Sequence, residues 1–347
     1  MLEDVDKLYS FVDLDGEKID LEKRQAIDQY KKVYKDFSFY LTSIILISAE
    51  RGDYTKRCVE NIFKYTPEPF EIIISDVGSS DETKRILEQL KKSSPNIHII
   101  CNQKSTGTTG QRNQGIHVSK GGLLVFMDND VLALPNWLKP LRKVVQDNQE
   151  IGAVGAKLLK PDGNSVYYCG AHAVTLEKGS KIYGIGLDKE EELSDLKKDD
   201  PVSQMEGNVP WYSTTTLLVR RDVVYLCGGF DDLKEGKGIF IANEDKDLCL
   251  SIRGEGFKIW YSPESETIHN HDYSKVNRKD KYHKDYRLRM DQIENDTLYF
   301  MKKWNLTYLL EKLPHEDNTK KLEKGKLVPF KIDLLSVPYS GDLVRLK

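Results

Sequence analysis

The chain has 347 residues, of which 39% are apolar and 31% are charged, a composition typical of a globular protein with a substantial core. Its 52 lysines and arginines nearly balance its 55 aspartates and glutamates, so the net charge is only −3. Because nucleic-acid-binding proteins usually carry a clear basic excess, we expect no nucleic-acid partner. The five cysteines form no CxxC pair, which argues against a cysteine zinc site and predicts buried, reduced thiols.

The first residues are acidic and lack the basic flank and apolar stretch of a signal peptide. No run of the sequence approaches the roughly 18 apolar residues that a membrane-spanning helix needs. These features predict a cytoplasmic protein without a transmembrane segment. They leave peripheral membrane contact and oligomer formation open, with the tyrosine-rich segment near the C-terminus as a candidate interface.

Hydrophobic periodicity divides the chain into three parts. Residues 1–41 are highly charged, and their apolar positions between 21 and 40 predict a helical N-terminal extension. From residue 42, short apolar strands alternate with amphipathic helices, which is typical of an α/β domain with a mostly parallel sheet. The expected strands cover 43–47, 71–75, 97–101, 123–127, 211–220 and 258–261, and the expected helices cover 54–65, 81–90, 111–119 and 244–254. A further long helix over 276–310 predicts a helical C-terminal extension, within 273–347.

Polar clusters follow several of the expected strands. Residues 48–51 follow the first strand, Asp76 follows the second, and Asp128-Asn129-Asp130 follows the fourth. In parallel sheets the ligand crevice lies beyond the carboxyl ends of the strands, so these clusters should converge on one edge. The Gly-Thr-Thr-Gly stretch at 107–110 predicts a flexible loop, and the absence of GK[ST] excludes a P-loop.

The Asp128-Asn129-Asp130 triplet suggests a metal site. Two carboxylates at a strand end offer hard oxygen ligands to a divalent cation, and such a cation could bridge a nucleotide diphosphate. The alternative is that these residues only cap a helix beginning near Pro135, since a DxD triplet is common by chance. Its position directly after Leu-Leu-Val-Phe-Met favours the metal site.

Glu244 and Asp245 lie at the start of an expected helix. Carboxylates there often only compensate the helix dipole. The functional alternative is a general base, with Asp245 as the first candidate and Glu244 as the second. His269 and His271 follow the strand at 258–261, and imidazole with carboxylates would suit Mn²⁺ better than Mg²⁺. A lone histidine in a loop, however, is usually only a surface residue.

Asp76 opens the turn Asp-Val-Gly-Ser-Ser-Asp, which has a plain interpretation as turn chemistry. The functional alternative places its carboxylate against a nucleobase or a ribose. Arg112 and Asn113, on the helix before the DxD strand, could contact the pyrophosphate or the base.

Taken in order, these motifs resemble family 2 glycosyltransferases of the GT-A fold over residues 42–272. The motifs that carry the resemblance are Ile44–Ile47, Asp76–Asp81, Arg112–Gly115, Phe126–Asp130, Gly228–Asp231, Asn243–Leu248, Gly256–Lys258, Tyr261–Pro263 and His269. The resemblance implies a Rossmann-like nucleotide-binding domain. It also implies inverting transfer of a sugar from a UDP- or dTDP-sugar to a hydroxyl of a glycan, lipid-linked intermediate or protein. The stretches at 155–163 and 169–170 resemble bacterial surface-glycan transferases.

The resemblance also assigns roles to individual residues. Asp128, Asp130 and His269 would hold Mn²⁺ or Mg²⁺, and Asp245 would be the base, with Glu244 as the alternative. Trp211 and residues 213–216 would line the donor-sugar or acceptor pocket. The family usually has a Pro-Thr-Tyr-like turn where this chain has Ser-Ala-Glu-Arg at 48–51. The residues expected to contact the donor are Ser48, Glu50, Asp76, Arg112, Asn113, Asp128, Asn129 and Trp211.

Two other functions are alternatives to this one. Nucleotidyltransferases that make sugar nucleotides carry a Gly-rich loop with Arg or Lys directly after the first strand, and residues 48–54 do not supply it. A non-catalytic nucleotide- or glycan-binding module of the same fold would need no base, whereas this chain has the DxD, Glu-Asp and His set intact.

Overall fold

The computed structural model describes residues 41–172, 187–188, 196–233, 237–270, 290–304, 308–310, 319–323 and 326–329. The helix expected between residues 21 and 40 and the alternative ligand His271 lie outside the described residues. Within them, no helix is both long enough and apolar enough to cross a membrane.

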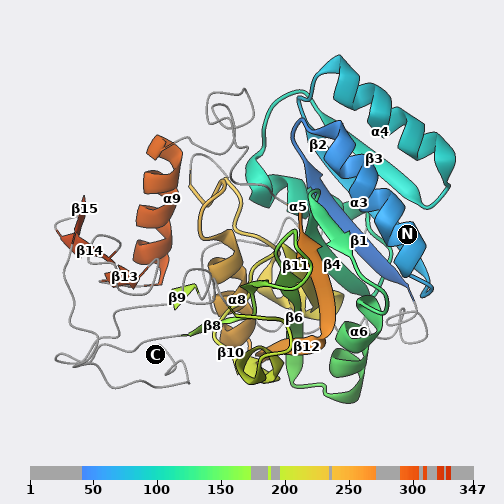
Figure 1. Cartoon of the computed structure of the whole chain (residues 1–347). Coiled ribbons are helices and arrows are strands. Elements are labelled where there is room, and N and C mark those ends of the chain that lie inside the picture. The colour runs from blue at the N-terminus through green and yellow to red at the C-terminus, as the bar shows by residue number, and fades with distance from the viewer. Residues whose placement is uncertain are drawn as a thin grey trace.

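A ten-stranded mixed sheet forms the centre of the molecule (Figure 1). Its main path runs in the order β10-β12-β6-β11-β4-β1-β2-β3, while β5 pairs with β12 and β7 with β6. The pairs β1–β2, β2–β3, β1–β4 and β6–β12 are parallel, and β11 runs antiparallel to both of its neighbours. The strands are β1 (Thr42–Ser48), β2 (Phe70–Val77), β3 (Ile97–Asn102), β4 (Leu123–Asp128), β5 (Val131–Ala133), β6 (Ile151–Leu159), β7 (Val166–Tyr168), β10 (Gly207–Val209), β11 (Thr216–Arg220) and β12 (Lys258–His269). The mostly parallel central sheet of the sequence prediction is thereby confirmed.

Helices cover both faces of this sheet, because the strand residues alternate between two separate apolar cores. Ile44 and Leu46 of β1 face one core, whereas Ile45 between them faces the other. The first core includes residues of α3 (Gly52–Tyr65), α4 (Asp81–Ser93) and α6 (Leu138–Asp147). The second includes residues of α5 (Gly107–Val118), α7 (Arg221–Cys227), α8 (Glu244–Gly254) and α9 (Met290–Lys303).

Smaller strands lie outside the central sheet. β8 (Ala171–His172) pairs with β9 (Leu187–Asp188), and near the C-terminus β13 (Tyr308–Leu310), β14 (Thr319–Glu323) and β15 (Lys326–Pro329) form an antiparallel sheet. A 3-10 helix, η1, covers Pro201–Gln204. The expected long helix over 276–310 is described only as α9, and its predicted end is wrong because residues 308–310 form a strand.

Four further local predictions need correction. The stretch at 107–110 is the first turn of α5 and not a flexible loop, since Thr108 bonds to the backbone of a distant segment at Phe240. The strand expected from residue 211 begins only at Thr216, and the strand expected at 258–261 continues to His269. Cys101, expected to be buried, is exposed.

Candidate functional site

The register of the parallel strands brings the predicted polar clusters to one edge of the sheet. Ser48 at the end of β1 pairs with Asp76 at the end of β2, and Ile47 pairs with Asp128 at the end of β4. The chain then turns through Asn129 and Asp130 into β5. The side chain of Asn129 is held by a hydrogen bond from its Nδ2 to Thr55 Oγ1 of α3, at 2.9 Å.

Asp128, Asp130 and His269 form one cluster of candidate metal ligands. β5 pairs with the end of β12 so that His269 lies opposite Val131, directly beside the DxD triplet. One ligand atom from each of the three residues lies within 4.8 Å of the others. His269 Nε2 is 3.3 Å from Asp130 Oδ1, both side chains are buried, and the imidazole packs against the ring of Tyr167. Two carboxylates and an imidazole are a donor set that fits Mn²⁺.

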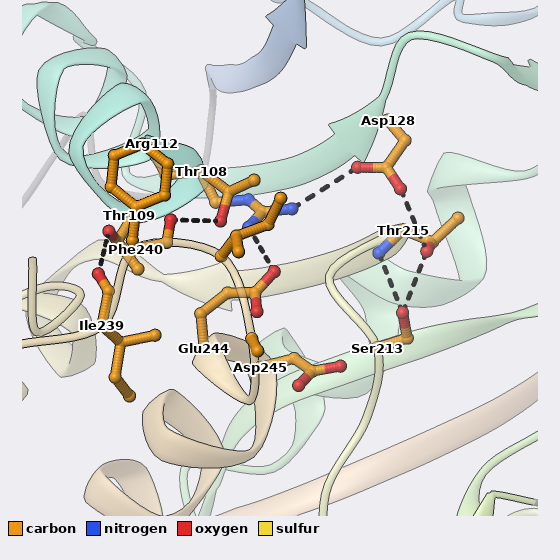
Figure 2. A network of polar contacts seen from close by, with 12 residues as sticks. Thr108, Thr109, Arg112, Asp128, Ser213, Thr215, Ile239, Phe240, Glu244 and Asp245 are labelled. Carbon is orange, nitrogen blue, oxygen red and sulfur yellow. Dashed lines mark hydrogen bonds and ion pairs between the residues drawn. The ribbon is translucent and has the colours of Figure 1, made fainter. Parts of the chain in front are cut away.

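Arg112 of α5 links this cluster to the start of α8. Its buried guanidinium donates to Glu244 Oε1 at 3.0 Å and lies 3.4 Å from Asp128 Oδ1 (Figure 2). The guanidinium also lies over the ring of Phe230, with its central carbon 5.5 Å from the ring centroid. Two carboxylates from distant parts of the sequence are therefore held by one buried cation.

A pair of hydroxyls orients the other side of Asp128. Thr215, just before β11, donates from Oγ1 to Asp128 Oδ2 at 3.3 Å, and its carbonyl accepts the N–H of Asp128. The hydroxyls of Ser213 and Thr215 are 2.9 Å apart (Figure 2). Such contacts behind a metal ligand fix its orientation and commonly change metal affinity by about 10- to 100-fold. The family resemblance assigned residues 213–216 to the donor-sugar or acceptor pocket and did not anticipate this contact.

Glu244 and Asp245 differ in their surroundings. Burial raises the pKa of Glu244 to about 7, and the neighbouring charge of Asp245 adds to this rise, whereas Arg112 opposes it. Asp245 is half-buried, and its Oδ1 accepts the N–H of Lys246 at 2.8 Å. Figure 2 shows Glu244 turned toward Arg112 and Asp245 turned to the other side, in the direction of Ser213. The two adjacent carboxylates thus lie in different environments.

A cavity of about 320 Å³ joins these elements. Asp128, Asn129 and Asp130 line it together with Arg112 and Glu244, so the DxD segment and the start of α8 share one space. Its remaining lining residues come from β1 and the residue after it, β2, α5 and the loop before it, α9 and the segment before α8: Ile47, Ser48, Ala49, Val77, Ser105, Gly107, Thr108, Gln111, Phe240, Ile241, Ala242 and Ile293. The sequence alone did not single out Phe240, Ile241 or Ile293, because an apolar side chain near a predicted helix carries no chemical signal.

Four of the predicted donor-binding residues do not line this cavity. Glu50 accepts the N–H of Ser80 at 3.0 Å and so caps α4. Asn113 exchanges two hydrogen bonds with the backbone of Phe230, at 2.8 and 2.9 Å. The predicted donor contacts of these two residues therefore have a competing structural explanation, which the sequence could not reveal because their partners are distant in the chain.

The other two are Asp76 and Trp211, and both are almost completely buried. Burial raises the pKa of Asp76, while hydrogen bonds from the hydroxyl and N–H of Ser79 oppose this rise. Its carboxylate thus holds the turn into α4. Trp211 lies beneath Lys246, whose Nζ is 4.6 Å from the centroid of the indole ring.

Residues 43–224, more than half of the chain, match the model of glycosyl transferase family 2. The chain belongs to this family. The chain is 25% identical over 252 residues to the O-antigen biosynthesis protein RfbC of Myxococcus xanthus, covering 71% of this chain and 18% of RfbC. It is 28% identical over 166 residues to the GalNAc(5)-diNAcBac-PP-undecaprenol beta-1,3-glucosyltransferase of Campylobacter jejuni, covering 48% of each chain. The family 2 chain thus aligns with less than half of the length of either relative.

Two solved structures are similar to the family 2 chain, each with a TM-score of 0.51. GalNAc-T7 with UDP, GalNAc and Mn2+ is 17% identical, with 67% of this chain and 44% of that chain covered. The mannosyltransferase PcManGT from Pyrobaculum calidifontis, in complex with GDP-Man and Mn2+, is 14% identical, with 87% and 75% covered. These likenesses establish the fold, which is that of GT-A glycosyltransferases.

Proposed function

We propose that this family 2 protein is a metal-dependent, inverting glycosyltransferase that moves a sugar from a nucleotide diphosphate donor to an acceptor hydroxyl. The observation that carries the proposal is the single cavity lined by the DxD segment, Arg112 and Glu244. A UDP- or dTDP-sugar is the proposed donor. The acceptor is proposed to be a glycan, a lipid-linked intermediate or a protein, in line with the surface-glycan names of the family relatives.

Asp128, Asp130 and His269 would hold Mn²⁺, or Mg²⁺, at the carboxyl end of β4. A bound cation there supplies positive charge that stabilises the diphosphate as it leaves the sugar. The named complexes of GalNAc-T7 and PcManGT both contain Mn2+, which supports this choice of metal.

The protein's own groups would bind and orient the donor. Arg112 contributes a buried cation at the cavity wall, and Ser48 and Asn129 contribute polar groups at the ends of β1 and β4. The apolar side chains of Ile47, Val77 and Ile293 exclude water from the same space.

Asp245 is the proposed base. Its carboxylate would accept the proton of the acceptor hydroxyl while that oxygen attacks the anomeric carbon and the bond to the diphosphate breaks. Attack on the face opposite the leaving group inverts the anomeric configuration. Glu244 is the weaker candidate because its carboxylate is paired with Arg112 at 3.0 Å.

The test of donor binding uses isothermal titration calorimetry with UDP, dTDP and GDP, each in the presence of Mn²⁺ or of a chelator. We expect one nucleotide to bind only when Mn²⁺ is present, and Asp130→Ala to lose this binding because it removes a ligand from the cluster. Glu264→Ala is a matched control, since this exposed carboxylate lies on β12 but not in the cluster. Nucleotide binding that survives unchanged in Asp130→Ala, or that ignores the chelator, would refute the metal role.

A further inference from the structure

A short segment of the chain, residues 239–243, forms one wall of the cavity. We call it the wall segment. Phe240, Ile241 and Ala242 line the cavity, and Glu244 follows directly as the first residue of α8. Any shift of this segment would therefore change both the cavity shape and the position of the two carboxylates at 244–245.

The first turn of α5 holds one side of the wall segment. Phe240 O accepts hydrogen bonds from the N–H of Thr108 at 2.8 Å and from its Oγ1 at 3.2 Å, while Thr109 Oγ1 donates to Ile239 O (Figure 2). Gly107 permits this approach because it has a φ of +74°, and a Cβ there would lie 2.3 Å from Phe240 O.

A second helix, α9, also holds the wall segment. Asp296 is fully buried, and its Oδ2 accepts the N–H groups of Ile241 at 2.7 Å and of Ala242 at 3.0 Å. Its other oxygen accepts a hydrogen bond from Gln292 Nε2, one turn earlier on the same helix, at 2.8 Å. A carboxylate that accepts backbone N–H groups forms stronger hydrogen bonds than a neutral acceptor, so this contact anchors the wall segment firmly.

The last residue of the wall segment is also attached to α9. Asn243 has a φ of 66° and a ψ of 15°, in the left-handed region, where the chain turns sharply into α8. Its Nδ2 donates to Thr297 Oγ1 at 3.2 Å. Ile293 of the same helix lines the cavity. At its far end α9 is tied to α8, because Lys303 and Trp304 both bond to the buried carboxylate of Asp247.

We propose that α9 completes the transferase site and that Asp296 is a positioning residue for sugar transfer. It fixes the wall segment through two backbone amides and thereby sets the position of Glu244, which lines the cavity, and of the adjacent Asp245. The helix lies beyond residues 43–224, the part of the chain that matches the family model, so the family match does not include it. The inference depends on the proposed function, because it concerns how the base is placed.

The experiment compares the full chain with the variants Asp296→Ala, Asp296→Asn and Glu294→Ala. Asp296→Ala leaves two buried amides without their acceptor, and we expect kcat to fall about ten- to a hundred-fold, as a small misplacement of a reacting group can cause. Asp296→Asn keeps a carbonyl oxygen for both amides and should restore most of kcat. Glu294→Ala removes an exposed carboxylate from the same helix and should behave as wild type.

Two readouts separate positioning from general damage. Hydrogen exchange of the Ile241 and Ala242 amides should accelerate at least ten-fold in Asp296→Ala alone. Mn²⁺ affinity, measured by calorimetry with the metal alone, should stay unchanged, because Asp296 binds the wall segment, whereas the candidate ligands Asp128, Asp130 and His269 cluster at the ends of β4 and β12. If Asp296→Ala fails to fold, Thr297→Val replaces it, with an expected several-fold loss of kcat.

The outcomes distinguish the inference from the proposed function. A normal kcat in Asp296→Ala, or in Thr297→Val where that variant replaces it, would overturn the positioning role. Unchanged exchange at Ile241 and Ala242 in Asp296→Ala would also overturn it, as would weakened Mn²⁺ binding. A wild-type protein that transfers no sugar from any donor would instead overturn the proposed function, and the positioning role in transfer with it.

Discussion

Replacement of Arg112 by methionine tests whether the buried cation holds the two carboxylates together. The guanidinium is 3.0 Å from Glu244 and 3.4 Å from Asp128. At an effective dielectric constant of about 20, each contact corresponds to a gross attraction of roughly 5 kcal/mol, much of which is offset by desolvation. Removing one member of a buried ion pair typically costs about 3–5 kcal/mol, so we expect Arg112→Met to lower the free energy of unfolding by this amount at pH 8.

The loss in free energy of unfolding should depend on pH because Glu244 titrates between pH 5 and pH 8. Burial raises the pKa of Glu244 from 4.5 to about 7, so its ionisation destabilises the folded state as pH rises through this interval. Arg112 opposes that rise in pKa, so without it the pKa of Glu244 should be higher and the decline in stability should continue to higher pH. At pH 5 Glu244 is mostly protonated in the folded wild type, and only the contact with Asp128 is lost. The difference in free energy of unfolding between the wild type and Arg112→Met should therefore increase from pH 5 to pH 8.

Urea unfolding at pH 5 and pH 8, with a chelator present, measures both the loss in free energy of unfolding and its change with pH. Arg85→Met is the control, since Arg85 is exposed on α4 and its Nε donates to the carbonyl of Asp81 on the same helix, so its loss should be below about 0.5 kcal/mol. A loss of less than about 1 kcal/mol in Arg112→Met, or equal losses at both pH values, would refute the ion-pair account.

Two other substitutions test the neighbourhood of the cavity and the packing of the sheet. Thr215→Val keeps the side-chain shape but removes the hydroxyl that donates to Asp128, so Mn²⁺ should bind about ten-fold more weakly in calorimetry; an unchanged affinity would contradict this role. Gly155→Ala should lower stability by about 1–3 kcal/mol, because a Cβ on β6 would lie 2.1 Å from the ring of Tyr212. Thermal unfolding measures this loss. Gly254→Ala, where a Cβ meets nothing within 4 Å, should leave the stability unchanged in the same measurement. Equal losses of stability in the two variants would contradict the packing argument.

The sequence was most informative where local chemistry decides the structure. The apolar run at 123–127 is followed by Asp128, and an apolar run that ends in carboxylates predicts both a buried strand and a polar sheet edge. The rule that parallel strands present ligands at their carboxyl ends then placed Ser48 and Asp76 beside this edge. The GT-A fold followed from the order of these motifs, and the structural neighbours confirm it.

The sequence was least informative where a side chain is hydrogen-bonded to a partner that is distant in the sequence. Glu50 and Asn113 have the right chemistry for a nucleotide, but distant backbone groups at Ser80 and Phe230 already bind them. Asp296 shows the opposite case, in which the sequence offered no prediction for a residue that contacts the site. A single aspartate on an amphipathic helix carries no local signal of its contact with residues 241 and 242. Tertiary contacts decide each of these cases, and residue spacing does not record them.

The steady-state kinetics of Asp245→Asn test the proposed function most directly. The substitution keeps the shape of the side chain but removes its ability to accept a proton, so kcat for sugar transfer should fall by about two to four orders of magnitude. The KM for the donor should stay near the wild-type value, because the donor is bound by other residues. A near-normal kcat in Asp245→Asn would contradict the assignment of the base and move that role to Glu244 or to another residue.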